Sequence, residues 1–486
     1  MDRIRKKLKQ LADRYRSLNV RTKAALWFTV CSFLQKGISF ITVPIFTRLL
    51  STEEYGIYTL YLSWLQIFTV LSSLYLYHGV TDNAMSKFDD DRSRFISAMQ
   101  GLTITITTVL LGMVLLFMNS VQKLLDLAPV MILLMFAEVY VTPAFFFWSA
   151  RQRFEYRYKR LVALTVTKSF LNPVLGLIAV SVAKDKALAR VASVVFVEAA
   201  VCTPILIYQF CKGHVFFEKK YWKYALTLAL PMLPHYLSGI ILNHGDRIVI
   251  SHFFGKTEVA LYGLAYSIGM LVQLFVTAIN SALTPWVYSK LKTGDIKSIQ
   301  QKSRGVLLLI FLIAIGLMLV SPEVVLIFGS AKYADAVNVI PPVAGSVFFI
   351  FMYSFLSYPE FYYEKTAFLM IASLIAAALN LVLNFIFVPL YGYGAAAYTT
   401  LACYVIYSLG HYIVARRILE KEKGEKAVVD VRIALVLGLV LIAISPFMHL
   451  VYPYRIIRFI IIFAGLVLAF FERKRIIALL NSKSQL

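Results

Sequence analysis

Three basic residues lie deep inside long apolar stretches of the sequence: Lys36, Lys168 and Arg247. A cation near the centre of a membrane-spanning helix costs roughly 2.5–3.5 kcal/mol on the insertion scale, so such residues are rare. They can be structural, if each forms an internal ion pair, for instance Lys168 with Glu198. They can also be functional, if they line a polar cavity and bind an anionic substrate. The residues alone leave both interpretations open.

The apolar stretches contain further polar residues that could take part in the same chemistry. Three of them share the stretch that contains Arg247, and we expect them to line the same cavity: His235, Asn243 and His244. Three acids could carry a coupling ion such as a proton or sodium, or could simply pair with the cations: Glu138, Glu198 and Asp246. The four cysteines have no CxxC spacing, so we expect buried core thiols and no disulfide framework, metal site or cofactor.

The composition places these residues in a membrane. Of the 486 residues, 59% are hydrophobic and only 15% are charged, yet the net charge is +23. A soluble nucleic-acid-binding protein can be as basic, but not with so much apolar side chain to bury. The 36 Phe and 29 Tyr against only 15 Pro exclude a disordered chain. The sequence therefore predicts an all-α polytopic membrane protein with its basic residues in the loops.

Apolar stretches of about 20 residues, the length that crosses a bilayer as a helix, occur fourteen times. They lie at 24–47, 56–78, 95–118, 125–147, 160–180, 191–211, 224–249, 258–284, 305–328, 337–358, 366–388, 394–415, 431–450 and 454–471. With both termini in the cytoplasm, 36 of the 49 Lys and Arg fall in cytoplasmic segments and eight outside. This asymmetry follows the positive-inside rule. We expect a multi-pass membrane protein with both termini in the cytoplasm.

A weak internal repeat indicates two lobes. The pattern E-x-small-x-Y-x-L-x-x-S begins at Glu54 and again at Glu258, 204 residues later, and Asn172 and Asn380 are related by 208. Six spans used twice give parallel repeats, a known transporter plan with the substrate site between the halves. The predicted parts are a basic amphipathic cytoplasmic N-tail (1–23), an N-lobe (24–211), a cytoplasmic linker (212–223), a C-lobe (224–415), an extra helix pair (429–471) and a cytoplasmic C-tail (472–486).

Prolines predict distorted helices in the C-lobe. The seventh span contains Pro231 and Pro234, and the tenth contains Pro341 and Pro342. Proline removes a backbone donor and clashes with the preceding turn, so we expect both spans to be bent or broken. Bent helices beside a polar cavity would suit alternating access.

Several motifs, in this order, resemble those of Wzx-type polysaccharide flippases of the multidrug/oligosaccharidyl-lipid/polysaccharide exporter superfamily. They lie at 44–51 (PIFTRLLS), 53–56 (EEYG), 230–235 (LPMLPH), 246–250 (DRIVI), Asn380 and Asn384, and 389–396 (PLYGYGAA). The family's fourteen helices, arranged as two six-helix lobes plus a pair, also match the predicted organisation.

The resemblance implies transport of a lipid-linked oligosaccharide, typically on undecaprenyl pyrophosphate, from the inner to the outer leaflet for O-antigen or capsule export. Family members are thought to hold the sugar-pyrophosphate head in a cationic cavity, and Lys36, Lys168 and Arg247 would match that requirement. The expected partners are this substrate, membrane lipids and other assembly proteins such as a polysaccharide polymerase, with no nucleic acid.

Three other classes remain as alternatives: a drug exporter of the same fold, a membrane glycosyltransferase or polymerase, and a scaffold for a polysaccharide assembly complex. Drug exporters of the same fold expel organic cations and resemble one another in a carboxylate on the first helix, whereas this chain has Lys36 there and no acid. A membrane glycosyltransferase or polymerase would need catalytic acids in a sizeable outer loop, and the outer loops are short. We therefore expect a transporter rather than an enzyme.

Overall fold

The computed structural model describes residues 17–365 and 367–471, and these residues form helices and no strand. The helices of the first half are α2 (Val20–Leu49), α3 (Thr52–Ser73), α4 (Val80–Lys87), α5 (Arg92–Leu116), α6 (Met118–Leu125), α7 (Pro129–Phe154), α8 (Tyr158–Val182), α9 (Lys186–Gly213) and α10 (Lys219–Phe253). Those of the second half are α11 (Lys256–Gly269), α12 (Val272–Thr293), α13 (Ile296–Gly329), η1 (Ala331–Val339), α14 (Ile340–Leu356), α15 (Tyr358–Tyr362), α16 (Ala367–Tyr391), α17 (Ala395–Lys423), α18 (Val431–Ile444), η2 (Ser445–Phe447), α19 (Met448–Val451) and α20 (Arg455–Phe471).

The all-α multi-pass architecture is confirmed. Each of the fourteen predicted segments falls on one helix or on successive helices, and eleven stretches of the described chain are long and apolar enough to span a membrane. The other three predicted spans correspond to α3, α17 and α20, which do not meet that criterion. The number fourteen therefore stays a prediction. The N-tail up to residue 16 and the C-tail lie outside the described residues.

Packing divides the chain into two compact units. Unit 1 comprises residues 1–50 and 64–233, and unit 2 comprises 51–63 and 234–486. The boundary thus falls inside two continuous helices, α3 and α10. The lobes predicted from the repeat end elsewhere because they follow sequence similarity rather than packing, and their bounds stay a prediction.

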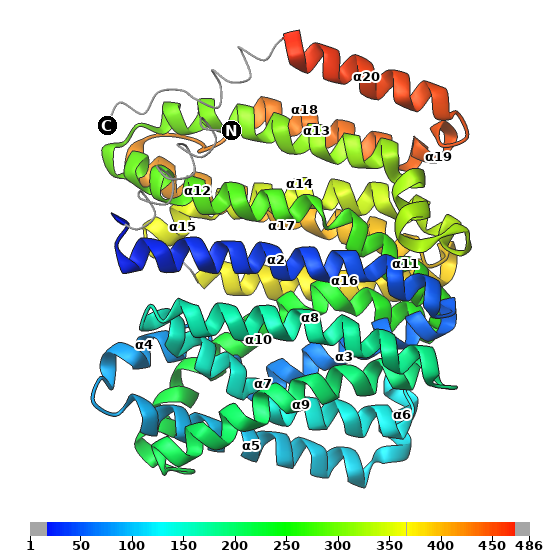
Figure 1. The fold of residues 1–486 in the computed structure, drawn as a ribbon. Helices are drawn as coiled ribbons and strands as arrows, with labels where there is room; N and C mark the ends of the chain where they lie inside the picture. The colour runs from blue at the N-terminus through cyan, green and yellow to red at the C-terminus, as the bar shows by residue number, and fades with distance from the viewer. Residues whose placement is uncertain (1–16, 366, 472–486) are drawn as a thin grey trace, which may run out of the picture. The chain divides into compact units, whose positions relative to one another are not determined.

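In unit 1 the long helices run side by side, with α9 packed against α5, α7 and α8, and α8 packed against α2 (Figure 1). Apolar side chains from α7, α8 and α9 form a buried cluster that includes Phe145, Leu161 and Cys202. The outward faces of these helices are apolar as well, as Phe170 and Ile178 on α8 illustrate. Apolar residues on both faces are typical of helices whose surroundings are lipid.

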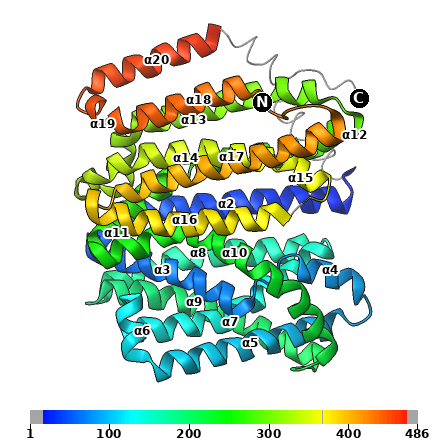
Figure 2. The same cartoon turned by 180° about the vertical axis from the view of Figure 1, so that it is seen from behind.

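In unit 2, α14 is the central helix and lies against α11, α12, α13, α17 and α18 (Figure 2). Its residues are almost all buried, among them Phe348, Phe351 and Phe355.

Helices α3 and α11, which both begin near the repeated motif, pack closely against each other. A Cβ on Gly56 would meet the backbone of Lys256, and one on Gly263 would meet the side chain of Thr59. The small residues of the repeat therefore permit this close helix packing.

The structure corrects several details of these expectations. Helix α10 is continuous from Lys219 to Phe253, so the prolines of the seventh span do not break it, and the expected bend stays a prediction. Pro341 and Pro342 occupy the first turn of α14, where a missing N–H leaves no helical bond unmade, so they begin the helix rather than bend it. The predicted span 258–284 is two helices, α11 and α12. Finally, Cys211 is exposed, whereas the other three cysteines are buried as expected.

Candidate functional site

Lys36 lies near the middle of α2 and is exposed. The helix begins at Asn19, whose side chain accepts a hydrogen bond from the backbone N–H of Thr22 at 2.8 Å, and it contains no acidic residue. No ion pair of Lys36 occurs among the described residues. The neighbouring Phe33 and Leu34 are exposed and apolar. Lys36 is therefore the one charged residue of α2 between Lys23 and Arg48.

Lys168 has a partner, in contrast. Its Nζ lies 2.6 Å from Glu198 Oε2, and the two side chains are 16% and 9% exposed. The same ammonium lies 4.6 Å from the centre of the Phe145 ring, which supplies a cation–π contact. The Cys202 thiol donates to Glu198 Oε2 at 3.5 Å. Lys168 thus forms the internal ion pair with Glu198 that the structural alternative predicted.

Glu138 is buried on α7, which packs against α9, the helix that carries Glu198. Unit 1 therefore contains two buried acids on adjacent helices, one of which, Glu198, forms the ion pair with Lys168 described above. That these acids carry a coupling ion in transport stays a prediction.

The most connected polar group of unit 2 is the carboxylate of Asp246, which is fully buried on α10. It accepts hydrogen bonds from the Tyr262 hydroxyl of α11, from Asn384 Nδ2 of α16 at 2.6 Å and from Thr400 Oγ1 of α17 at 2.9 Å. Four helices thus meet at one carboxylate. Because a buried charge is stabilised only when it is hydrogen-bonded, the three donors explain how Asp246 can remain in the interior.

A second layer of hydrogen bonds orients these donors. Asn384 Nδ2 also donates to Asn380 Oδ1 at 3.3 Å, and Thr399 donates to Asn384 Oδ1. Asn380 Nδ2 in turn donates to Thr400 Oγ1 at 3.1 Å. We call Asp246, Tyr262, Asn380, Asn384, Thr399 and Thr400 the Asp246 network. Its carboxylate, amide and hydroxyl oxygens are the donor types that hard cations prefer, and a carboxylate can also take up a proton.

Arg247 and Asn243 adjoin this network on the same helix. Arg247 is buried, its guanidinium donates to the Asn243 carbonyl at 2.7 Å, and it lies 4.5 Å from the centre of the Tyr266 ring. The Tyr266 hydroxyl donates to Asn243 Oδ1 at 3.0 Å. Two predicted site residues, Asn243 and Arg247, are thus brought together with the acid Asp246.

The two histidines of α10 that the sequence predicted as site residues, His235 and His244, form no hydrogen bond with the Asp246 network. His235 Nδ1 is 2.8 Å from the Ser373 hydroxyl of α16, and the residue is about 16 Å from Asp246 along the helix at 1.5 Å per residue. His244 is half-buried and has no hydrogen bond to another described residue. The prediction that His235 and His244 bind substrate stays untested.

Of the six residues of the Asp246 network, sequence reasoning named only Asp246 as a candidate site residue. Asn380 and Asn384 stood out as part of a motif, and Tyr262 belongs to the repeated pattern. Thr399 and Thr400 gave no signal, because hydroxyl residues are common in apolar helices. A pair of Asn residues four positions apart was the usable indication, since both side chains then lie on one helix face.

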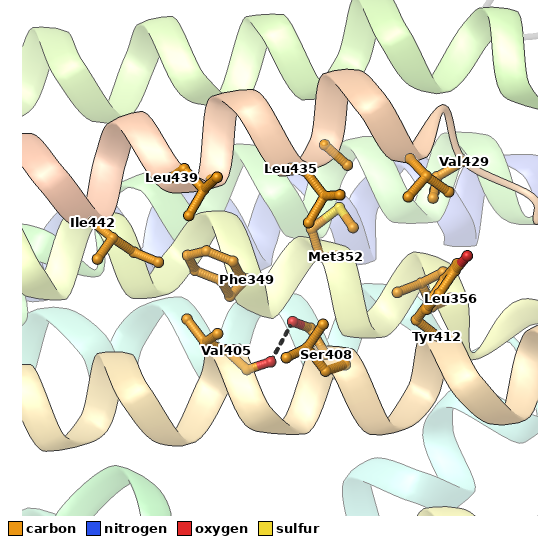
Figure 3. A pocket seen from close by; sticks show the side chains of 14 residues that line it. Phe349, Met352, Leu356, Val405, Ser408, Tyr412, Val429, Leu435, Leu439 and Ile442 are labelled. Atoms are coloured by element: carbon orange, nitrogen blue, oxygen red, sulfur yellow. Dashed lines mark hydrogen bonds between the residues drawn. The ribbon is translucent and has the colours of Figure 1, made fainter.

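An apolar pocket of about 450 Å³ lies between α14, α17 and α18 of unit 2 (Figure 3). Its walls are formed by Phe349, Met352 and Val405, and its only polar side-chain groups are the hydroxyls of Ser408 and Tyr412. Leu435 and Leu439 at its edge are more than half exposed. A cavity of this composition can hold hydrocarbon and offers nothing to a charged group.

Comparisons with known proteins agree with this arrangement. Residues 22–291 match the family model described as polysaccharide biosynthesis protein, and residues 231–386 match that of MatE. An uncharacterized membrane protein of Haemophilus influenzae is 24% identical over 307 residues, which cover 61% of this chain and 73% of that protein.

Two solved structures share the fold. The lipid II flippase MurJ, in an inward closed conformation, is similar with a TM-score of 0.71 at 17% identity, over 93% of this chain and all of that one. An inward-facing multidrug resistance transporter of the MATE family is similar with a TM-score of 0.58 at 14% identity, over 83% of this chain and 99% of that one. The chain belongs to the polysaccharide biosynthesis protein family.

Proposed function

We propose that the protein is a flippase that moves a lipid-linked oligosaccharide of the undecaprenyl pyrophosphate type across the bacterial cytoplasmic membrane. It would carry the substrate from the inner to the outer leaflet by alternating access, for surface polysaccharide synthesis. The family to which the chain belongs supports this substrate class over others. Membrane lipids and a polysaccharide polymerase acting on the exported product would be its partners.

Lys36 is the observation that carries the proposal. A lone ammonium in the apolar part of a membrane helix is costly unless an anion meets it, and no acid on α2 does so. A pyrophosphate supplies two charges and several acceptor oxygens, which makes it a strong partner for a lysine ammonium. An organic cation, the substrate of drug exporters, would be repelled by the same residue. Lys36 therefore favours an anionic substrate over the drug-exporter alternative.

The apolar pocket of unit 2 supports the lipid-linked nature of the substrate. Its volume is about 450 Å³, which accommodates part of a long isoprenoid chain, and its exposed edge at Leu435 and Leu439 would let a chain enter from the bilayer. We propose that this pocket takes a segment of the substrate's hydrocarbon while the charged head is held elsewhere.

We further propose that the Asp246 network binds the coupling ion, a proton or sodium. Asp246 is buried and joined to three other helices of unit 2, so a change in its charge would be felt by all of them. Asp246→Asn keeps the shape of the side chain and removes its charge. It should abolish the dependence of transport on the ion gradient while the protein still folds.

Flipping itself can be tested in vesicles that contain the purified protein and a lipid-linked oligosaccharide in both leaflets. A glycosidase added outside should cleave only the outer half of the substrate in protein-free vesicles, and nearly all of it when the protein is present. Cleavage that stops at the outer half in both preparations would contradict the flippase proposal. Transfer of sugar by the purified protein would instead support the glycosyltransferase alternative.

A further inference from the structure

A buried acid–base pair in unit 2 has no part in the site described above. Glu360 on the short helix α15 and His411 on α17 are both fully buried, and His411 Nδ1 lies 2.7 Å from Glu360 Oε1. The second oxygen of the carboxylate and the second nitrogen of the imidazole, Oε2 and Nε2, have no hydrogen-bond partner among the described residues. Two titratable side chains therefore share one contact and leave two buried polar atoms unsatisfied.

The surroundings of the pair are aromatic. The His411 ring lies 4.7 Å from the ring of Tyr407, 5.4 Å from that of Phe368 and 5.8 Å from that of Tyr353, measured between centroids. These rings exclude water and supply no charge. A net charge on the pair would thus be poorly solvated in this conformation.

In the described part of the chain, Glu360 forms its ion pair with His411 and with no cation of the helices around it. Helix α15 packs against α12, α14 and α17, and α17 packs against α16. Helices α14 and α16 contain no charged residue. The charged residues of α12 and of the last turns of α17 are Lys290, Lys292, Arg416, Arg417, Glu420, Lys421, Glu422 and Lys423. Lys290 binds Asp295, and Arg416 binds Glu420.

The remaining titratable groups of these helices are phenols and one thiol. They are the thiol of Cys403 and the hydroxyls of Tyr288, Tyr353, Tyr358, Tyr362, Tyr391, Tyr398, Tyr404, Tyr407 and Tyr412. A phenol ordinarily ionises near pH 10 and a thiol near pH 8.5, so none of them balances a charge on the pair at neutral pH. The pair must therefore balance its own charge while it is buried.

The pair is neutral only when it holds one proton, either as imidazolium and carboxylate or as imidazole and carboxylic acid. Loss of that proton leaves a net charge of −1, and uptake of a second proton, at Nε2 or Oε2, leaves +1. Each change makes or breaks one N–H or O–H bond and exchanges the proton with water. Because an uncompensated buried charge costs several kcal/mol, both charged states favour a conformation in which water reaches the pair.

We propose that Glu360 and His411 form a proton-binding site whose loading controls the docking of α15 onto α17. With one proton bound, α15 stays docked; when the pair becomes charged, the five-residue helix moves away and the site opens to water. The predicted topology places α15 at the cytoplasmic end of the tenth span, where such movement would gate access from the inside. The proton site is independent of which substrate is carried.

A buried thiol introduced directly before α15 can report this movement in the full-length protein. Ser357 is 5% exposed at the start of α15, and Ser357→Cys is nearly isosteric. Cys31, Cys202 and Cys403 are replaced by alanine, and the exposed Cys211 is kept as the reference thiol that corrects for the pH dependence of the labelling reaction. The quantity measured is the rate at which a water-soluble maleimide labels the introduced thiol, divided by the rate at which it labels Cys211.

The labelling ratio is measured from about pH 5 to about pH 9. It should be lowest at the pH where the pair holds one proton. On either side of that pH it should rise by up to about tenfold per pH unit, the slope for the exchange of one proton. Glu360→Gln, which keeps the side-chain shape, should flatten the profile. Glu364→Gln, at an exposed acid two residues after α15, should leave it unchanged. A flat ratio in the protein with the native pair would overturn the proposal even if Glu360→Gln fails to fold. So would an unaltered pH profile in a folded Glu360→Gln protein. Neither result depends on whether the protein flips a lipid-linked oligosaccharide.

Discussion

At the scale of single residues, the three intramembrane cations have different surroundings. Lys168 is paired with Glu198, Arg247 is buried next to Asp246 and Tyr266, and Lys36 is exposed on a helix without acids. The sequence could suggest the first pair because adjacent helices carry the two residues. It could not reveal the donors to Asp246, because hydroxyl and amide residues are scattered over every helix and only the packing selects three of them.

The Lys168–Glu198 pair should behave as one unit. Lys168→Met leaves Glu198 buried without its cation, so the free energy of unfolding should fall by about 3–5 kcal/mol, the range for breaking a buried pair. Glu198→Gln should cost a comparable amount, and the double variant should lose clearly less than the sum of the two, because neither charge is then stranded. Unfolding of the purified variants in detergent measures these differences. Losses that simply add would mean that the two side chains do not stabilise each other.

At the scale of helices, the hydrophobic segments of the sequence predicted the position of nearly every long helix. Where a helix breaks or begins inside such a segment depends on packing and could not be predicted. The break between α11 and α12 lies in an apolar stretch with no proline, and Gly269 beside it packs closely against Val343. The hydropathy of the sequence gives no indication of such a break. The opposite error concerned Pro341 and Pro342, which lie at a helix start that the hydrophobic pattern does not mark.

The contact between α3 and α11 gives a prediction at this scale. Gly56→Ala places a Cβ against the backbone of Lys256, which cannot rotate away, so the free energy of unfolding should fall by about 1–3 kcal/mol. The matched control is Gly112→Ala on α5, where nothing lies within 4 Å of the added atom. That variant should be neutral or stabilised by up to about 1 kcal/mol, since alanine favours helix. Equal effects of the two substitutions on thermal unfolding would argue against close packing at Gly56.

The junction of α12 and α13 should respond to acid. The Lys290 ammonium, at 2.7 Å, and Ser298 hold the pKa of the Asp295 carboxyl below its usual value. This stabilisation is present at neutral pH and is lost as the pH falls through the lowered pKa, below about pH 4. Because the site is exposed to solvent, the effect should be at most about 1 kcal/mol. Asp295→Asn should remove this part of the acid sensitivity of thermal unfolding, whereas Asp90→Asn, at an exposed acid, should not. If the unmodified protein and both variants lose stability in acid to the same extent, Asp295 is not the source of the effect.

At the scale of the whole molecule, hydropathy and loop charge were sufficient to predict a multi-pass helical protein, and the order of motifs was sufficient to indicate its family. The two packed units could not be predicted, because their boundary runs through α3 and α10, which are continuous in sequence and in structure. The charge of +23 is mostly a matter of loop orientation, with 36 basic residues in predicted cytoplasmic segments. The choice between an anionic and a cationic substrate depends instead on a single residue, Lys36.

The most direct test of this account is the affinity of purified Lys36 variants for a soluble isoprenoid pyrophosphate such as farnesyl pyrophosphate. Loss of a charge-assisted contact is worth roughly 1.5–3 kcal/mol, so Lys36→Ala should weaken binding by about 10- to 100-fold. Lys36→Arg should retain most of the affinity, and Lys123→Ala, at an exposed lysine of α6, should retain all of it. If Lys36→Ala binds the pyrophosphate as tightly as the unmodified protein, Lys36 does not hold the head group, and the proposed binding of an anionic substrate at this residue is wrong.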